Sequence, residues 1–295
     1  MKVKIQVFLL ESFVTVLCFL PKPVISVISR CLRLAAYPFI GKEREKIFQN
    51  CEHILQLPRH SQFARQFCRQ VLQHQIESAL ESAITNHKRR GKDPIAVSGL
   101  EELAVTLKGL KRSQKGVIVV TAHLGAWEFV GRYCSKAVGE GFVALAKPSK
   151  SRAITEYLDR CRARMNTFVL WTDRKTLLKD MLETMNGNQM LGLVSDQKPN
   201  SRKGPVVRFF GRDTAFVSGP AKLAIKTKAP ILTVFCMREA PWRYRIIHKT
   251  IIDPNHSESD EVMLTQSFAS EIERVIRLYP EQWVWNYKRW RFLVN

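Results

Sequence analysis

One histidine and one glutamate stand five residues apart in the run His-Leu-Gly-Ala-Trp-Glu, residues 123–128. The apolar run before it, 117–121, predicts a buried strand, so His123 lies in the turn and Glu128 in the first turn of the next helix. On one regular helix the two side chains would point about 140° apart. Across a turn, Glu128 can reach one ring nitrogen of His123. The other nitrogen can then take a proton from a substrate hydroxyl, so the substrate itself is the nucleophile.

Plainer interpretations of this run stay open. A glutamate in the first turn is also favoured by the helix dipole alone, beside an unrelated turn histidine. The rival nucleophile Cys134 is expected to be a buried thiol, and the chain has no Gly-x-Ser-x-Gly turn. Gly125 permits an unusual backbone angle, and the amides at the helix start are candidates to steady an oxyanion.

The elements that would position these residues alternate between short apolar runs and helical patterns. Strands are expected at 117–121, 142–146, 167–171, 190–195, 231–236 and 243–252. Helices are expected at 127–137, 151–165, 174–185, 219–226 and 262–278. This alternation predicts an α/β fold with a largely parallel central sheet flanked by helices, whose chemistry gathers beyond the carboxyl ends of the strands.

The chain divides by pattern into three parts: residues 1–40, 41–90 and 91–295. The first is apolar with basic interruptions and predicts membrane-associated helices, in or on the bilayer. Two helices packed on the catalytic domain, or one face on lipid and the other on protein, are the alternatives. The second part is helical, and the basic turn 88–94 separates it from the α/β catalytic domain.

The charge balance points to an anionic partner. Lys and Arg number 47 against 26 Asp and Glu, a formal net charge of +21. Nucleic acid, an anionic membrane surface and acidic substrates or carrier proteins all fit, but no nucleic-acid-binding module is recognisable. The seven cysteines form no Cys-x-x-Cys pair and are expected to be reduced thiols. No metal-ligand spacing occurs among the His residues, so neither a metal nor a cofactor is expected.

Several blocks in order resemble one family. They are the run 123–128, Arg162-Ala163-Arg164, Asp196-Gln197, Phe209-Phe210-Gly211, the small-residue helix from Gly219, and Pro280 to Trp285 followed by Lys288-Arg289-Trp290. Together they resemble the lipid A biosynthesis acyltransferases of Gram-negative bacteria, the late lauroyl- and myristoyl-type enzymes, whose hallmark is His-x₄-Asp/Glu. The resemblance implies a glycerol-phosphate-acyltransferase-like fold.

The resemblance also implies a reaction. A fatty acyl chain on acyl carrier protein is transferred to a hydroxyl of a phosphorylated lipid A precursor that bears Kdo sugars. The expected location is the cytoplasmic face of the bacterial inner membrane. His123 would be the general base and Glu128 its partner. Arg164, with Arg162 as the second choice, and Asp196 would position substrate or support the site, and Gln197 would bind substrate.

The predicted substrate site includes a basic segment, and two nearby positions differ from the pattern of the family. Lysine and arginine residues follow Asp196 and are expected to hold phosphates or Kdo carboxylates: Lys198, Arg202, Lys203, Arg208 and Arg212. An ordinary solvated loop is the alternative. Lys147-Pro148 stands where the family often has Arg-Pro, which removes a bidentate fork. Asn166 stands where glycine usually follows the Arg-x-Arg stretch.

Two aromatic segments can each be interpreted in two ways, and other acceptor molecules are also compatible with the sequence. Phe209 and Phe210 could line an acyl pocket or belong to the core. The aromatic C-terminus, 283–290, suits a membrane interface or core packing. A glycerol-phosphate or mannoside acyltransferase with the same mechanism is the closest rival function, and a basic nucleic-acid-binding protein is a more distant one. Acyl-chain length and the acylated hydroxyl are not encoded in a readable pattern.

Overall fold

The computed structural model describes residues 2–87, 93–199, 204–252 and 260–290. Its helices are α1 (Lys2–Cys18), α2 (Lys22–Ala36), α3 (Gly41–Leu55), α4 (Gln62–Thr85), α5 (Leu100–Lys111), α6 (Glu128–Val138), α7 (Arg152–Arg164), α8 (Leu177–Asn186), α9 (Gly219–Thr227), α10 (Glu261–Leu278) and the 3-10 helix η1 (Pro280–Gln282). Its strands are β1 (Ala96–Ser98), β2 (Val117–Thr121), β3 (Phe142–Ala146), β4 (Thr167–Trp171), β5 (Met190–Val194), β6 (Val206–Phe209), β7 (Arg212–Ala215), β8 (Ile231–Ala240) and β9 (Arg243–Ile252).

The central sheet has seven strands in the order β1-β9-β8-β2-β5-β3-β4. All neighbouring pairs are parallel except β8 and β9, which form a long antiparallel hairpin. Strand β2 lies in the middle and is buried along its whole length. The predicted α/β class with a largely parallel sheet is therefore confirmed. The predicted boundary at residue 90 falls outside the described residues.

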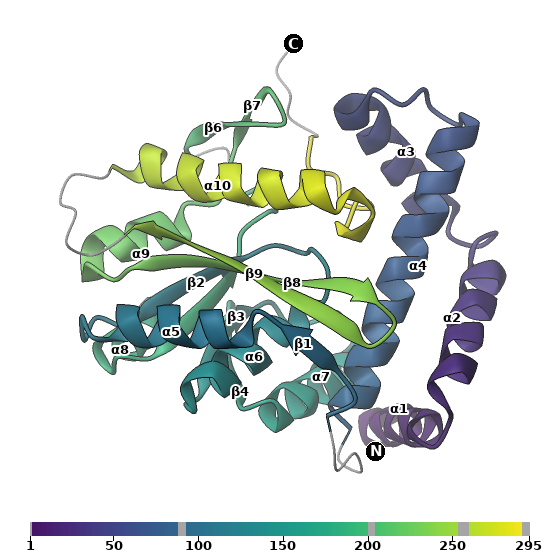
Figure 1. The fold of residues 1–295 in the computed structure, drawn as a ribbon, viewed down its shortest axis with the longest axis horizontal. Coiled ribbons are helices and arrows are strands. Elements are labelled where there is room, and N and C mark those ends of the chain that lie inside the picture. The colour runs from purple at the N-terminus through teal and green to yellow at the C-terminus, as the bar shows by residue number, and fades with distance from the viewer. Residues whose placement is uncertain (1, 88–92, 200–203, 253–259, 291–295) are drawn as a thin grey trace.

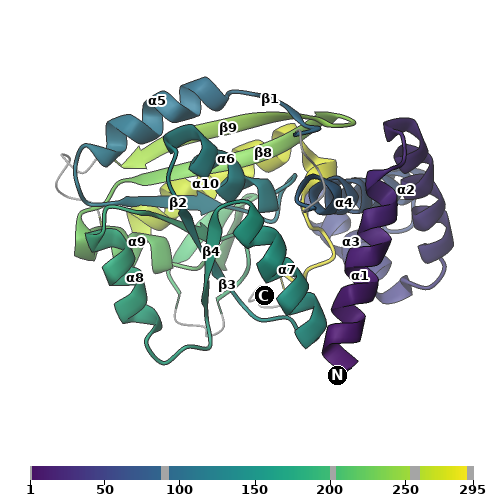
Figure 2. The ribbon, with the colours of Figure 1, turned by 90° about the horizontal axis from the view of Figure 1, so that it is seen from below.

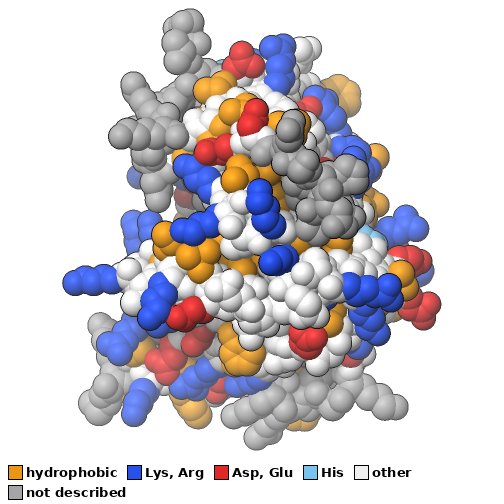
Figure 3. Space-filling model, turned by 90° about the vertical axis from the view of Figure 1, so that its left-hand side faces the viewer, with side chains coloured by type: hydrophobic (Ala, Val, Ile, Leu, Met, Phe, Trp, Pro, Cys, Tyr) orange, Lys and Arg blue, Asp and Glu red, His pale blue; other side chains and the backbone are white. Residues whose placement is uncertain are grey.

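Helices cover both faces of the sheet and also its carboxyl edge (Figures 1 and 2). One core lies between the sheet and α8, α9 and α10, and the other between the sheet and α5, α6 and α7. The N-terminal helices α1 to α4 form a separate layer beside the sheet, with α1 packed along α7 (Figure 2). On the opposite side of the molecule, Lys and Arg side chains are spread over the surface rather than gathered in one patch (Figure 3).

A buried ionic cluster fixes α4 to the β8–β9 hairpin. Glu81 of α4 accepts hydrogen bonds from Arg238 Nη2 at 2.8 Å, from the Tyr244 hydroxyl at 2.7 Å and from the Trp242 amide at 3.2 Å. Arg238 also pairs with Glu77 at 2.7 Å. Because the carboxylate and guanidinium are nearly inaccessible to water, each depends on the other for its charge balance. The cluster therefore sets where α4 lies against the sheet.

The N-terminal helices carry many exposed apolar side chains. On α1 these are Ile5, Phe8, Leu9, Phe13 and Val16, and they are followed by Phe19, Val24, Val27, Leu34 and Phe39. Among the described residues, no helix taken alone has the length and hydropathy of a membrane span; α2 and α3 reach them only jointly, across a 95° bend. The other face of α1 packs on protein, where Glu11 pairs with Arg164 at 3.0 Å and Arg160 at 3.6 Å.

Candidate active site

His123 and Asp196 meet because their strands are neighbours in the sheet. Strands β2 and β5 pair in parallel, with Thr121 opposite Val194. Each functional residue stands two positions past its strand end, so the register places them side by side. His123 Nδ1 lies 2.8 Å from Asp196 Oδ1. The second carboxylate oxygen, Oδ2, accepts a hydrogen bond from Trp283 Nε1 at 2.8 Å.

The two side chains differ in their access to water. Asp196 is 3% exposed, whereas His123 is 26% exposed. Burial lowers the pKa of His123, but the charge and hydrogen bond of Asp196, with a contribution from Glu128, outweigh it and raise that pKa above the ordinary value. Burial likewise raises the pKa of Asp196, but His123 and the Trp283 N–H overcome it and lower that pKa. The pair thus couples a buried carboxylate to a more accessible imidazole, and no described residue makes a hydrogen bond to its Nε2.

Glu128 has a different partner from the one expected. It is the first residue of α6 and accepts two hydrogen bonds from Arg162 of α7, Nε to Oε2 at 2.9 Å and Nη2 to Oε1 at 2.7 Å. The predicted contact in which Glu128 accepts a hydrogen bond from the His123 ring is therefore wrong in this structure, and Asp196 takes that place. The reason is topological, because the turn after β5 delivers a carboxylate directly beside the ring. Glu128 still acts on His123 through its charge.

The turn between His123 and Glu128 requires glycine. Gly125 has φ of 60°, and a Cβ there would clash with the carbonyl oxygen of Cys236 on β8. The Gly125 and Ala126 amides donate to the carbonyls of Gln282 and Cys236 at 3.0 and 2.8 Å. These two amides are therefore engaged within the protein. The oxyanion role expected of the amides at the helix start, which begins at Glu128, stays a prediction.

An apolar cavity of about 380 Å³ opens beside Glu128. Its walls come from α1, α4, α7 and the turn before α6, and they consist of Leu10, Gln75, Ser78, Ala79, Ser82, Ala83, Gly125, Ala126, Trp127, Glu128, Ile154, Tyr157, Leu158, Cys161 and Met165. The volume and lining are typical of a site for an apolar ligand with one polar end. At the end of the cavity near Glu128 lies Trp127. Its ring packs edge to face with the His123 ring, and the two ring centroids are 5.4 Å apart.

Comparison with known proteins shows to which family this chain belongs. The chain matches the bacterial lipid A biosynthesis acyltransferase family over residues 1–292, nearly its whole length. The chain belongs to this family of acyltransferases. Residues 123–128 and 196–197, on which the resemblance rested, lie together at the site just described.

Curated relatives are more distant. A phosphatidylinositol mannoside acyltransferase from Mycolicibacterium smegmatis is 26% identical over 172 residues, covering 57% of this chain and 55% of the relative. One from Mycobacterium tuberculosis is 24% identical over 203 residues, covering 67% and 61%. The match thus spans less than two thirds of these relatives.

The structure separates the two arginines of the acyltransferase. Arg162 binds Glu128 at the edge of the cavity, whereas Arg164 points to α1, where it binds Glu11. The structure therefore places Arg162, and not the preferred Arg164, beside Glu128, and which of the two positions substrate stays a prediction. Both lie in the last turn of α7, and residues two apart on a helix face different directions.

The other residues predicted to bind substrate lie in different places. Gln197 lies close to the site, with Nε2 3.4 Å from His123 Nδ1. Lys198 follows it, and the Tyr287 hydroxyl interacts with its backbone. Lys147 is exposed beyond the end of β3. Arg202 and Lys203 lie outside the described residues.

Four aromatic residues belong to the core rather than to the apolar cavity: Phe209, Phe210, Trp283 and Trp285. Phe209 and Phe210 are buried against Trp283 and Trp290, and neither lines the cavity. Trp285 is fully buried. Core packing, one of the two alternatives for these residues, is therefore the correct one. The role of Trp283 as the donor to Asp196 was not predicted, because the indole comes from a segment 87 residues away.

A titration tests the link between His123 and Asp196. In Asp196→Asn the pKa of His123 is expected to fall, because the negative charge that favours the imidazolium is gone. A Glu128→Gln change should lower it less, since Glu128 contributes only through its charge. Imidazole NMR shifts followed against pH measure both values. An equal pKa in wild type and Asp196→Asn would contradict the pairing.

Proposed function

We propose that this acyltransferase moves a fatty acyl chain from acyl carrier protein to a hydroxyl of a phosphorylated, Kdo-bearing lipid A precursor. The observation that carries the proposal is the His123–Asp196–Trp283 arrangement beside the mouth of an apolar cavity. Family membership supports the acyl transfer, and the resemblance of the ordered blocks supports the acceptor. The formal charge of +21 suits both an acidic carrier protein and a phosphorylated glycolipid.

The reaction needs one base and no enzyme nucleophile. His123 Nε2 takes the proton of the acceptor hydroxyl while its oxygen attacks the carbonyl carbon of the acyl thioester. The tetrahedral intermediate then expels the carrier thiol, and the imidazolium returns the proton to the sulfur. The products are one new ester and one free thiol. Asp196 holds Nδ1–H in place and stabilises the imidazolium, as an orienting carboxylate does in a hydrolase triad.

Glu128 and Arg162 act as a positioning pair in this scheme. Their bidentate contact ties the start of α6 to the last turn of α7, which are two walls of the cavity. Such paired geometry is strong because both hydrogen bonds join charged groups. The charge of Glu128 also makes His123 more basic.

An acylation assay tests the proposed function. Purified full-length protein is incubated with acyl carrier protein carrying chains of several lengths and with a Kdo-bearing lipid A precursor, and products are identified by mass spectrometry. The expected product is heavier by one acyl group, and far less of it should form with Asp196→Ala. Absence of acylation with every chain length would overturn the proposed acceptor or donor.

A mannoside acceptor is the second candidate, favoured by the two mycobacterial relatives. The same assay includes phosphatidylinositol mannoside as acceptor, with acyl carrier protein or coenzyme A as alternative carriers of the chain. Transfer to the mannoside alone would keep the mechanism and replace the acceptor.

The cavity is proposed to hold the acyl chain, which makes its size a determinant of chain length. Ala83→Phe should fill part of it and shift preference to shorter chains, whereas Leu158→Ala should enlarge it and favour longer ones. Each methylene that gains or loses burial is worth about 0.8 kcal/mol, or about fourfold in relative kcat/KM. Competition between acyl donors of different length measures the preference. Val105→Phe, on the exposed face of α5, is the control and should change nothing.

The exposed apolar residues of α1 and α2 are proposed to insert into an anionic membrane surface on the cytoplasmic side of the inner membrane. Replacing Phe8 and Phe13 by serine should weaken binding to vesicles of phosphatidylglycerol at least tenfold, since burying each ring in lipid is worth about 1.5–3 kcal/mol. Sedimentation with vesicles measures the affinity. Phe168→Ser, at an exposed position of β4, is the matched control. Equal binding by all three proteins would assign membrane contact to other surfaces.

A further inference from the structure

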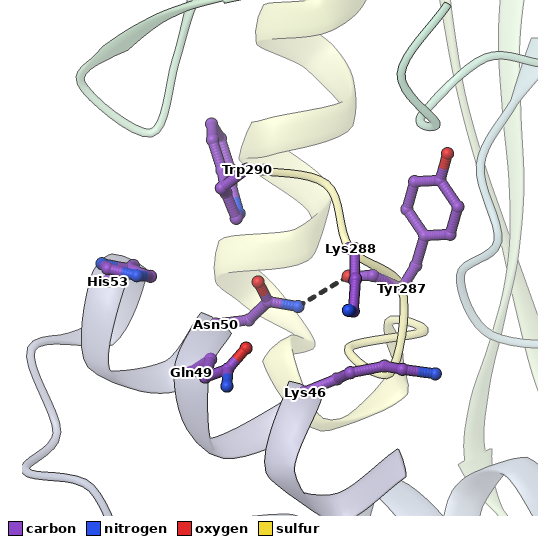
Figure 4. A pocket seen from close by; sticks show the side chains of 7 residues that line it. All are labelled: Lys46, Gln49, Asn50, His53, Tyr287, Lys288 and Trp290. Atoms are coloured by element: carbon purple, nitrogen blue, oxygen red, sulfur yellow. Dashed lines mark hydrogen bonds between the residues drawn. The ribbon is translucent and has the colours of Figure 1, made fainter. Parts of the chain in front are cut away.

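A second, polar cavity lies between α3 and the segment that follows η1, residues 283–290. Its volume is about 240 Å³. Its lining consists of Lys46, Gln49, Asn50 and His53 from α3, and of Tyr287, Lys288 and Trp290 from the C-terminal segment (Figure 4). None of these residues belongs to the apolar cavity, and none has a role in the proposed transfer.

The walls of this cavity are fixed before any ligand enters. Asn50 Nδ2 donates to the carbonyl oxygens of Trp285 and Tyr287 at 2.5 and 2.8 Å, which holds the C-terminal segment on α3 (Figure 4). On the other side, Arg289 donates to Thr214 Oγ1 at 3.3 Å and to the Ala215 carbonyl at 3.0 Å. Lys288 therefore stands between two anchored neighbours. A ligand would meet a preformed site and would not need to order the chain.

The cavity offers donors and positive charge but little negative charge. Lys46 and Lys288 bring two ammonium groups, and Gln49 and His53 add polar side chains. Glu43 pairs with Lys46 at 3.5 Å, but both groups are partly exposed, so this pair is weak and can yield to a better acceptor. Within the part of the chain that the structure describes, no acidic group pairs with Lys288.

The Trp290 indole provides an independent sign of a ligand. The residue is only 7% exposed, and its Nε1–H has no hydrogen-bond partner in the described structure. The nitrogen lies at the end of the ring that faces α3 and the cavity (Figure 4). A buried donor without a partner costs about 1–3 kcal/mol, so a ligand that supplies an acceptor oxygen recovers this free energy.

We infer that this cavity binds a phosphoryl group. A phosphate presents several strongly accepting oxygens, which suit the positive charge and the indole N–H that line this cavity. An apolar ligand would leave these donors unpaired. Two sources share this chemistry: a sugar phosphate on a glycolipid, and the headgroup of a membrane phospholipid. The inference does not depend on acyl transfer.

Calorimetric titration of the full-length protein with inorganic phosphate, at constant ionic strength, tests the site. Saturable binding is expected in wild type, and Lys46→Gln/Lys288→Gln should weaken it at least tenfold. Lys108→Gln/Lys115→Gln removes the same charge from exposed positions near α5 and should stay within twofold of wild type. Trp290→Phe keeps an aromatic ring but removes the N–H, and a loss of about fivefold is expected. The two lysine variants alter only surface side chains, so their folding can be checked by circular dichroism.

Two outcomes overturn the inference: no saturable phosphate binding by wild type, or an equal loss in the cavity and control variants. Competition with soluble headgroups then separates the two sources. Tighter binding of glucosamine 1-phosphate than of glycerol 3-phosphate identifies the sugar phosphate, and the reverse order identifies the phospholipid headgroup. No acyl donor is present, so the result is independent of whether the proposed transfer occurs.

Discussion

Replacing His123 with alanine is expected to lower kcat for acyl transfer by about 10²–10⁴-fold, the contribution of a positioned general base. KM should change little, because the imidazole is proposed to act on the proton of the hydroxyl rather than on binding. The thermal unfolding midpoint should remain close to that of wild type, since His123 stands in a turn and is partly exposed. Steady-state kinetics with saturating acyl donor measure the loss.

A matched substitution excludes a general effect of losing a histidine. His60→Ala removes an exposed imidazole near Glu45, on the loop between α3 and α4, and should leave kcat unchanged. Near-normal turnover by His123→Ala would remove this residue as the base. It would also make the Asp196–Trp283 contact a purely structural one.

Arg238→Ala is expected to lower the free energy of unfolding by about 3–5 kcal/mol, the cost of breaking a buried ion pair by removing one partner. The Glu81 carboxylate would keep its hydrogen bonds from Tyr244 and Trp242 but lose the guanidinium that balances its charge. Urea unfolding followed by circular dichroism measures the change. Because α4 supplies five residues of the apolar cavity, chain-length selectivity should broaden as well.

Arg245→Ala gives the comparison for this second experiment. That guanidinium is mostly exposed and pairs with Glu239 at 3.5 Å, so its loss should cost about 0–1 kcal/mol. A similarly small cost for Arg238→Ala would mean that hydrophobic packing, not the ionic cluster, fixes α4 to the hairpin.

The sequence predicted most strands of the central sheet well because they are rich in apolar residues. Strand β2 is buried along its whole length, whereas the edge strand β4 is partly exposed. Residues 117–121, 142–146 and 167–171 read as continuous apolar runs, and β2, β3 and β4 have these bounds. Other elements were not predicted. Strand β1 has only three residues, and the β6–β7 hairpin is short and turns at Phe210-Gly211, so neither carries a clear periodicity. Helix α5 was also missed.

The sequence indicated His123, Glu128, Arg162 and Asp196 as site residues, but it did not indicate which of them bind one another. Glu128 was predicted to be the partner of His123 because it is near in sequence, and Asp196 was predicted to position substrate or support the site. Strand order decides the matter: β5 pairs with β2, which brings Asp196 to the ring from 73 residues away. A single sequence does not contain that order. The same holds for Arg162 and Arg164, whose different partners depend on where α1 and α6 lie beside α7.

Helix α1 has two unlike faces, and this bears on how the enzyme would sense its surroundings. Leu10 lines the apolar cavity and Glu11 is tied to α7, whereas Phe8 and Phe13 point outward and are at least half exposed. A helix with its side chains is about 10–12 Å across. The partition between the apolar cavity and the exterior is thus a single helix thick. Pressure, thickness or fluidity of a layer in contact with the outer face would be transmitted directly to the shape of the cavity.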